Sequence, residues 1–460
     1  MRAKRPPKER EDFFKSFIQV NGIPGGVFSL NTDSDGRYAS YYDICHKYPE
    51  QAAAIWSILS TFRESGATLL PMRDMDGNQA KINQPFQVGK IISLVDRVTT
   101  SSAIQDILSG LFSDSRLMSD ILNEEPISSS QLEGAATTTK VALEMLETDR
   151  KPANESEMMI ARNHDMMTFI RQNEVLSQDL TSDLIRTIHD RATLAINDEH
   201  YQPGQMRQSN DVNVQDVRTG QVIFQPPNYQ ELAGRIDELC VWVNTPHHIF
   251  NGKDYIHPLI KACVLHFMIG WLHPFNDGNG RTARGLFYWV MMKYGYTGFE
   301  YISISKYLKK SAVAYGTAYL NCEYDRFDLT YFIDYLLRQI QLAIREFSEY
   351  INSQREMFEY LTSGFVGSER FGKLNERQRK IVISGLMRGG RRYSAGLIAR
   401  LYDVAFNTAK SDLEAIAKNS FFKETIISKN KFYITPKTLK QLEEWQQPPE
   451  AANRPKATDW

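Results

Sequence analysis

The sequence predicts a mainly α-helical protein. Apolar residues recur at helical spacing along most of the chain, from residues 52–62 near its start to residues 406–419 near its end. Short β-like segments occur in two places, residues 212–224 and 423–435. Hydrophobic residues make up 42% of the 460 residues, as in an ordinary soluble protein of two to four domains.

Residues 1–115 are predicted to form an N-terminal, mostly helical region. Amphipathic patterns predict helices over residues 52–62 and 86–98, with a turn at residues 74–77. The first twelve residues are charged and contain no apolar stretch, and no run of about 18 apolar residues occurs anywhere. We therefore expect a cytoplasmic protein without a secretory signal or a membrane span.

Neither the cysteines nor the overall charge indicates a metal site or a nucleic-acid partner. The net charge of −1 neither favours nor excludes a nucleic-acid partner. The four cysteines have no metal-ligand spacing, so we expect reduced thiols at Cys45, Cys240, Cys263 and Cys322.

Residues 273–284 concentrate the groups of a phosphate-binding site. They read His-Pro-Phe-Asn-Asp-Gly-Asn-Gly-Arg-Thr-Ala-Arg, and an apolar pattern predicts a helix over residues 281–292. Glycines allow the tight turns with which a backbone presents several N–H groups to one anion. Arg281 and Arg284 are three residues apart, so they lie on one face of the first helical turn. Because the dipole favours acids at a helix N-terminus, two cations there indicate a bound anion.

His273 and Asp277 add reactive groups to this stretch. Histidine has an unperturbed pKa of about 6.5, which suits it to removing a proton from an incoming hydroxyl. A carboxylate such as Asp277 can hold a hard divalent cation that also binds phosphate oxygens. The residues alone therefore predict a phosphate site with a base beside it.

This stretch resembles the signature of Fic-domain proteins, His-Pro-Phe-x-(Asp/Glu)-Gly-Asn-Gly-Arg-x-x-Arg, at every fixed position. The resemblance implies a mostly helical core and transfer of AMP from ATP to a Ser, Thr or Tyr hydroxyl of a target protein or of the chain itself. It implies that His273 is the general base and that Asp277 holds Mg²⁺. It also implies that Arg281 binds the β-phosphate and Arg284 the γ-phosphate. The nucleotide-binding set that follows is Phe275, Gly278, Asn279, Gly280, Arg281 and Arg284.

Residues 127–134 allow two interpretations. Serines followed by Gln or Glu are typical of a helix N-terminus, which they cap. The stretch also resembles the inhibitory motif of the Fic family, (Ser/Thr)-x-x-x-Glu-(Gly/Asn), with Ser129, Glu133 and Gly134 at the fixed positions. Its place upstream of the signature is that of the class with an N-terminal inhibitory helix. We expect Glu133 to pair with Arg284 and so to occupy the group meant for the γ-phosphate.

A hairpin is predicted over residues 212–224, where β-branched residues flank an Arg-Thr-Gly turn. In Fic proteins a hairpin at this place, the flap, lies over the active site and aligns the target protein by strand addition. The alternative is a structural hairpin without a partner. Gln225 stands where relatives often have valine, which leaves the target preference open.

Two further residues rest on the resemblance. Asn163 matches an asparagine that the family commonly has on the helix after the inhibitory motif. Tyr315, on a helix predicted over residues 305–321, aligns with a tyrosine of the adenine pocket. Tyr315 and Tyr319 have the i, i+4 spacing that is equally typical of core packing.

A second domain is predicted after the Fic core. The core, residues 116–361, ends in a long helix over residues 328–361, and a Gly/Ser-rich linker follows. Residues 374–437 resemble a winged helix, with three helices over 376–387, 394–402 and 406–419 and two β-segments after them. Residues 438–460 are predicted to form a flexible tail.

The winged-helix-like stretch is basic. Residues 374–436 contain twelve Lys or Arg and five Asp or Glu. Asn407 or Thr408 could reach a groove of DNA while lysines contact phosphates, or the domain could bind a protein. We keep a DNA partner and a protein partner as alternatives.

Together these observations predict an autoinhibited, Mg²⁺-dependent protein adenylyltransferase that uses ATP. One alternative is a de-AMPylating hydrolase, in which Glu133 orients a water at the same site. Another is a DNA-binding regulator whose Fic core senses nucleotides and whose DNA contacts include Arg391, Arg392 and Lys410. The target protein, the trigger that frees Glu133 and the existence of a homodimer stay open.

Overall fold

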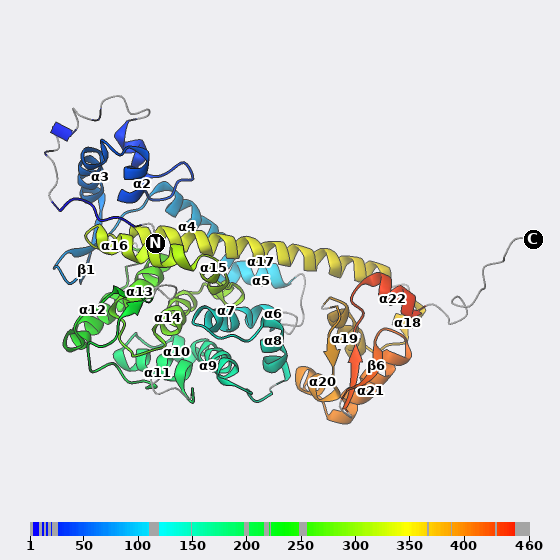
Figure 1. Cartoon of the computed structure of the whole chain (residues 1–460). Helices are drawn as coiled ribbons and strands as arrows, with labels where there is room; N and C mark the ends of the chain where they lie inside the picture. Colours follow the sequence, from blue (N-terminus) through cyan, green and yellow to red (C-terminus); the bar gives the residue numbers. More distant parts are fainter. Residues whose placement is uncertain are drawn as a thin grey trace, which may run out of the picture. The chain divides into compact units, whose positions relative to one another are not determined.

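The computed structural model describes residues 3–8, 12, 15–16, 20, 26–109, 119–148, 150–196, 202–215, 220, 222–247, 255–365, 368–387, 389–427 and 430–446. This part is mainly α-helical, as predicted, and contains three small antiparallel sheets (Figure 1). The chain divides into two compact units. The first comprises residues 1–105 and 120–346, and the second comprises residues 106–119 and 347–460.

The first unit begins with a helical part that carries a hairpin. Helices α3 (Ala52–Gly66) and α4 (Phe86–Thr99) confirm the two predicted helices. Between them β1 (Thr68–Arg73) pairs with β2 (Gln79–Ile82) around the predicted turn. The sequence prediction missed these strands, because Pro71 counts against a strand although short edge strands tolerate it. This part also contains η1 (Val27–Asn31) and α2 (Tyr41–Lys47), and α5 (Ser101–Ser109) follows α4.

Hydrogen bonds join this N-terminal part to the start of helix α17 (Thr330–Phe365) and to the residues just before it. The N–H of Lys81 donates to the Phe327 carbonyl at 3.2 Å, and the Lys81 carbonyl accepts from the Leu329 N–H at 2.9 Å. Arg63, buried near the end of α3, donates to the hydroxyl of Tyr331 at 2.8 Å. Because buried polar groups need such partners, these contacts fix the N-terminal part on the core.

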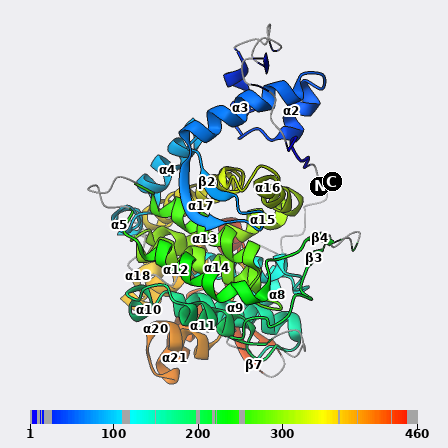
Figure 2. The ribbon, with the colours of Figure 1, turned by 90° about the vertical axis from the view of Figure 1, so that its left-hand side faces the viewer.

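Helices α13 (Pro258–Leu272) and α14 (Asn279–Lys293) form the centre of the first unit (Figure 2). They pack against each other and are joined by residues 273–278. Nearly every residue of α13 is buried, as expected for a helix that is apolar on all sides. His257 caps its N-terminus, since Nδ1 accepts the Leu259 N–H at 3.1 Å, and Pro258 occupies the first turn.

Other elements of the first unit surround this central pair. Residues 305–321 form two helices that part at Ser311, where one helix was predicted. The surrounding elements are α7 (Glu124–Leu132), α8 (Thr139–Thr148), α9 (Glu155–Ile170), α10 (Asn173–Leu176), α11 (Ser182–Thr193), η3 (Tyr229–Glu231), α12 (Leu232–Asn244), η4 (Thr297–Tyr301), α15 (Ser305–Lys310) and α16 (Ala312–Tyr324), with α6 (Ser119–Leu122) just before α7.

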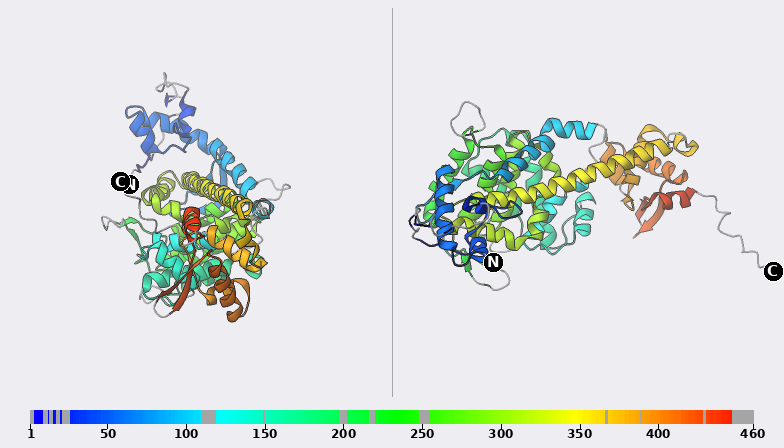
Figure 3. Two further views of the ribbon diagram at one scale, coloured as in Figure 1. Left: turned by 90° about the vertical axis from the view of Figure 1, so that its right-hand side faces the viewer. Right: turned by 90° about the horizontal axis from the view of Figure 1, so that it is seen from above.

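Helix α17 is 36 residues long and is drawn in yellow in Figure 3. It confirms the long helix predicted over residues 328–361. It continues to Phe365, into the stretch where a linker was predicted. Residues 366 and 367 lie outside the described part, and Ser368 then caps α18 (Glu369–Gly372).

The second unit has its own core of helices and a three-stranded sheet. Helices α19 (Glu376–Met387), α20 (Ala395–Tyr402) and α21 (Phe406–Lys418) confirm the three predicted helices. Strands β6 (Lys423–Ile427) and β7 (Asn430–Ile434) confirm the two predicted β-segments, and β5 (Arg392–Tyr393) completes a sheet of order β5-β7-β6. The assignment of this unit to the winged-helix class stays a prediction.

The flexible tail predicted from residue 438 is wrong for its first part. Residues Leu439–Gln446 form helix α22. Its Leu442 is buried in the same apolar core as Leu413 and Phe422, which gives the helix a reason to stay docked. The rest of the predicted tail, residues 447–460, lies outside the described part.

Two predictions from composition can also be compared with the structure. All four cysteines are free, as expected. Within the described ranges, no helix combines the length and the apolar character needed to cross a membrane.

Candidate active site

His273 lies at the C-terminal end of the central helix α13. It has left-handed backbone angles, φ 49° and ψ 58°, which end the helix, while its N–H still donates to the Ile269 carbonyl. The ring is half-buried, and Nδ1 lies 3.3 Å from the Gly270 carbonyl oxygen. When Nδ1 donates to that carbonyl, Nε2 keeps its lone pair. Burial lowers the pKa of His273, so the ring is neutral and able to accept a proton at neutral pH.

The loop after His273 is braced by Asn279. The side chain of Asn279 accepts the Phe275 N–H at 2.9 Å and donates to the Phe275 carbonyl at 2.8 Å. Gly278 has φ +79°, and a Cβ there would collide with Thr193 and crowd His189. Because the turn is closed by side chain and backbone together, α14 begins at Asn279 with its free N–H groups in the loop.

His189, which sequence reasoning missed, supports the same loop from α11. Its Nε2 donates to the Asp277 carbonyl at 2.8 Å, and its Nδ1 accepts the Gly204 N–H at 3.0 Å. Its ring stacks on Phe275 with 3.6 Å between ring centres. Burial lowers the pKa of His189 to about 4, in agreement with a neutral ring that donates through one nitrogen and accepts through the other. A histidine in an amphipathic helix gives no sequence signal of such a role.

Asp277 is half-buried beside these groups. Its Oδ1 accepts the N–H of Gly278, which orients the carboxylate at the start of α14. The described residues contain no cluster of three or more His, Cys, Asp or Glu side chains that could hold a metal ion by themselves. One carboxylate fits Mg²⁺, which keeps several waters and takes further ligands from substrate phosphates.

Arg281 and Arg284 both lie buried in the first turns of α14. Arg281 donates from Nη1 to the Ala192 carbonyl at 2.7 Å, so this cation is tied to the end of α11. Arg284 instead faces α7. The two arginines that the sequence placed on one helical face therefore have different surroundings.

The predicted pair of Glu133 and Arg284 is present. Oε1 of Glu133 lies 2.7 Å from Nη2 of Arg284. Arg284 also donates to Ser129, from Nε to the hydroxyl at 2.8 Å and from Nη2 to the carbonyl at 3.2 Å. Burial alone would lower the pKa of Arg284, but the charge of Glu133 and its neighbours raises it, so the cation is kept.

Residues 127–134 do not form a helix N-terminus, so the local capping interpretation is wrong. Ser129 lies inside α7, and Glu133 occupies its C-terminal end. Gly134 follows with φ +103°, a conformation that glycine adopts without strain and that ends the helix. The helix therefore presents Glu133 from its last turn.

Helix α7 is anchored on both sides. Nδ2 of Asn163 in α9 donates to the Pro126 carbonyl at 2.9 Å. On the other side the buried carboxylate of Glu125 accepts from the hydroxyls of Ser303 and Ser305 and from the Ser305 N–H. These contacts hold α7 in the position from which Glu133 reaches Arg284.

Gly280 lies directly under the Glu133 carboxylate. A Cβ at position 280 would collide with Oε1 of Glu133 and would lie 3.0 Å from Nη1 of Arg284. The carboxylate therefore occupies the space over the N-terminus of α14, where an anion is favoured by the N–H groups and the dipole.

Residues 179–291 of the chain match the Fic/DOC family. The chain therefore contains a Fic/DOC domain. The matched region includes the hairpin and residues 273–284, whereas Glu133 lies upstream of it.

Relatives that carry a Fic name are similar in sequence to part of the chain. Protein adenylyltransferase Fic of Drosophila virilis is 27% identical over 221 residues, which are 47% of this chain and 42% of that protein. Protein adenylyltransferase fic-1 of Caenorhabditis elegans is 32% identical over 83 residues, 17% of this chain and 15% of that protein. The matches thus span less than half the length of these relatives.

Solved Fic structures also align with the chain. A Fic family protein from Desulfovibrio desulfuricans G20 is 16% identical, with a TM-score of 0.47 over 76% of this chain and 94% of that one. A fragment of Fic-1 from Caenorhabditis elegans is 18% identical, with a TM-score of 0.40 over 58% of this chain and 76% of that one.

The predicted flap of the Fic/DOC domain is a hairpin of β3 (Val214–Gln215) and β4 (Val222–Phe224). Its turn, residues 216–219, and Gln221 lie outside the described part. Phe224 lies 6.1 Å, between ring centres, from Trp271 in the last turn of α13, so the hairpin lies close to His273. Gln225 donates to the carbonyls of Asn210 and Val212 and closes the base of the hairpin.

Tyr315 belongs to an aromatic cluster beside the central helices. Its hydroxyl lies 2.8 Å from Nε2 of His266, and its ring is 5.4 Å from that of Tyr319. The contacts in the structure are those of core packing, and the adenine role stays a prediction.

Some of the side chains predicted to contact DNA are exposed in the second unit, and others are half-buried. Asn407, Lys410 and Arg392 are exposed, while Thr408 and Arg391 are half-buried. A DNA partner for this unit stays a prediction.

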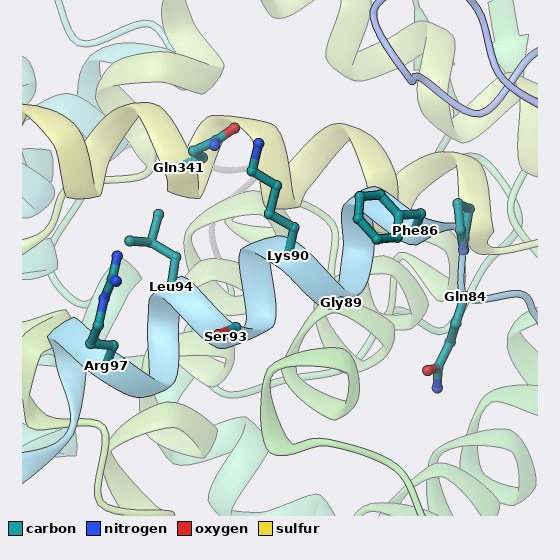
Figure 4. Close-up of a pocket in the computed structure, with 9 residues that line it drawn as sticks. Gln84, Phe86, Gly89, Lys90, Ser93, Leu94, Arg97 and Gln341 are labelled. Atoms are coloured by element: carbon teal, nitrogen blue, oxygen red, sulfur yellow. The ribbon is translucent and has the colours of Figure 1, made fainter.

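A separate pocket of about 680 Å³ lies between α4 and α17 (Figure 4). Phe86, Lys90, Leu94 and Arg97 line it from α4, and Gln341 lines it from α17. None of the residues 273–284 lines this pocket, so it is distinct from the loop of the Fic/DOC domain.

Proposed function

We propose that this chain is an autoinhibited protein adenylyltransferase that transfers AMP from ATP to a hydroxyl side chain of a target protein. The observation that carries the proposal is the ion pair of Glu133 with Arg284 above the loop that begins at His273. The relatives named protein adenylyltransferase support the choice of reaction.

In this proposal His273 removes the proton from the target hydroxyl. The lone pair of Nε2 accepts it, and the hydroxyl oxygen attacks the α-phosphorus of ATP as pyrophosphate leaves. A neutral ring is needed for this step, and the lowered pKa of His273 provides it at neutral pH. Strand addition to the flap at residues 212–224 would bring the target side chain to the base.

The loop and α14 would bind the phosphates. The N–H groups of Gly278, Asn279 and Gly280 would face the anion, with Phe275 and Asn279 holding the loop in shape. Arg281 would lie at the β-phosphate and Arg284 at the γ-phosphate. Asp277 would hold Mg²⁺, which neutralises phosphate charge when bound. Tyr315 would line the adenine site.

Glu133 would inhibit the enzyme by competing for Arg284. While Glu133 occupies the guanidinium and the space over Gly280, the γ-phosphate cannot reach its cation. ATP that binds would have misaligned phosphates, and in-line attack at the α-phosphorus would be lost. Basal AMP transfer should therefore be low.

The test is transfer of label from ATP labelled at the α-phosphate to protein in the presence of Mg²⁺. The intact chain, Glu133→Gly, Glu133→Gln and Glu133→Gly with His273→Ala are compared. We expect strong labelling with Glu133→Gly, weaker labelling with Glu133→Gln, little with the intact chain and none with the double variant. Glu133→Gln is the matched control, because it keeps the shape of the side chain and removes only its charge.

Two results would contradict the proposal. Labelling that persists without His273 would exclude this residue as the base. An equal rate with and without the Glu133 carboxylate would remove the inhibitory role, while leaving the transferase reaction in place.

AMP removal is a second candidate because Glu133 keeps 29% of its side chain exposed while paired with Arg284. Water can therefore reach the carboxylate, which could orient it toward an AMP-modified side chain. Protein labelled by the Glu133→Gly variant and then incubated with the intact chain would release AMP if this candidate is right.

A further inference from the structure

Arg207 is a buried cation whose partners are all uncharged oxygens. Arg207 is 3% exposed, and no ion pair among the described residues includes it. Burying a charge is costly unless hydrogen bonds compensate, so the partners of such a residue show what it holds in place.

One group of partners is the turn that carries His273. Nε of Arg207 donates to the His273 carbonyl at 2.9 Å, and Nη2 makes a longer contact of 3.5 Å to the Leu272 carbonyl. The backbone N–H of Arg207 donates to the Pro274 carbonyl at 2.8 Å. A left-handed non-glycine residue persists when its surroundings determine its conformation. Three successive carbonyls bound by one residue do this at His273.

The other group of partners lies at the base of the flap. Nη1 donates to the Ser209 carbonyl at 2.9 Å and to Oδ1 of Asn210 at 3.3 Å, just before β3. Nη2 donates to the Pro227 carbonyl, just after β4. Both ends of the hairpin are therefore tied to the guanidinium that also holds the His273 turn.

We propose that Arg207 is a positioning residue that holds the flap and the His273 turn in a fixed arrangement relative to each other. A target hydroxyl presented by the flap would then meet Nε2 of His273. This inference rests on the proposed function. A planar guanidinium with five N–H groups can bind acceptors in three chain segments, whereas a lysine ammonium cannot reproduce that fork.

The charge of Arg207 also acts on the base. Burial lowers the pKa of His273 most, and the Arg207 charge lowers it further, whereas the hydrogen bond to the Gly270 carbonyl and the charges of Glu133 and Asp277 raise it. Of these groups, Arg207 comes from the segment before the flap, Glu133 from α7 and Asp277 from the loop. Loss of the Arg207 charge should therefore move the acidic limb of a pH–rate profile to higher pH, and a purely structural residue would not do this.

The experiment compares Arg207→Lys and Arg207→Gln in the Glu133→Gly protein. We expect both to lower kcat/KM for the target protein by roughly 10²-fold, because a displaced reacting group loses alignment. ATP affinity should stay unchanged, because Arg207 touches neither Arg284 nor the N-terminus of α14. The acidic limb should shift upward in Arg207→Gln and stay in place in Arg207→Lys, which keeps the charge.

A milder variant and a control complete the test. Asn210→Ala, at an exposed position, removes one flap acceptor and should raise KM for the target severalfold without changing the pH profile. Arg63→Lys alters another buried arginine, away from the loop, and should lower the Tm without changing AMP transfer. Unchanged kcat/KM and pH profile in both Arg207 variants would overturn the inference.

A readout without catalysis separates the two proposals. The pKa of His273, measured by NMR with His273→Ala for assignment, should rise in Arg207→Gln. Amide hydrogen exchange of residues 202–215 should also become faster in that variant. If the Glu133→Gly protein transfers no AMP but both changes occur, the proposed function fails and the positioning role stands. If AMP is transferred and neither change occurs, the positioning role fails alone.

Discussion

Arg284 and Arg207 are both buried cations near His273, but their partners differ in kind. Among the residues that the structure describes, Arg207 donates only to uncharged oxygens, most of them backbone carbonyls of the flap base and the His273 turn. Arg284 donates to Ser129 and forms an ion pair with a carboxylate on the last turn of α7. Backbone carbonyls cannot leave without unfolding the segment, whereas a side-chain carboxylate can be replaced by another anion.

This difference indicates which of the two cations is available to a substrate. A charge-assisted pair between a guanidinium and a carboxylate has the geometry of a guanidinium with a phosphate. In the proposed function, Arg284 would exchange Glu133 for a γ-phosphate with little change in its own surroundings. Within the described ranges, Arg207 has no carboxylate partner that an anion could replace, so it is suited to holding structure.

The largest expected effect comes from removing Arg284, the cation whose bound anion can be replaced. Arg284→Ala in the Glu133→Gly protein should lower AMP transfer by at least ~10²-fold and weaken ATP binding, because the γ-phosphate loses its partner. Isothermal titration with ATP and Mg²⁺, together with the labelling rate, measures both. ATP affinity equal to that of the parent would place the γ-phosphate elsewhere and end the contrast with Arg207.

Removing the exchangeable anion should have the next largest effect. A hydrogen bond to a charged group contributes about 1.5–3 kcal/mol, so Glu133→Gly should raise AMP transfer roughly 10- to 100-fold. Initial labelling rates at saturating ATP measure the change. Ser129→Ala, which removes a neutral acceptor of Arg284 and keeps the carboxylate, should give a much smaller increase; an equal increase would shift the inhibitory role from charge to packing.

His189 is, like Arg207, a buried side chain that is bound by backbone atoms, so it tests the same side of the comparison. Its pKa of about 4 is below the ordinary value, so its contribution to stability is present above pH ~6.5 and is lost as the pH falls toward 4. The free energy of unfolding should fall by about 2 kcal/mol between pH 7 and pH 5 through this residue. Urea unfolding at both pH values should show a smaller fall in His189→Gln and the parental fall in His46→Gln, which changes an exposed ring.

The smallest effect is expected where α7 is anchored. Asn163→Ala removes the hydrogen bond to the Pro126 carbonyl, a loss of about 1 kcal/mol, so AMP transfer in the otherwise intact chain should rise only about fivefold. The labelling assay measures this. Asn163→Ala combined with Glu133→Gly should give no further increase, because α7 then has no carboxylate to place; an added increase would mean that Asn163 acts on the loop directly.

Much of the fold was predictable because its signals are local. Helices α4 and α19 begin and end within a residue or two of the predicted bounds, since apolar periodicity and nearby breakers mark them. The β1–β2 hairpin and α22 were missed. Pro71 counts against a strand, which obscured the hairpin in the sequence. Helix α22 depends on Leu442, which docks into a core formed by residues that precede it in the chain.

The sequence by itself determined the chemistry of the loop, because residues 273–284 are contiguous and glycines, a histidine, an aspartate and two arginines need no fold to be recognised. It could name Glu133 only by resemblance, since the pair with Arg284 joins residues 151 positions apart. The tertiary structure alone decided that Arg207 holds His273 and that His189 holds Asp277, across 66 and 88 positions. The physical reason is that a buried polar group must find partners in three dimensions, and the chain order does not record which ones.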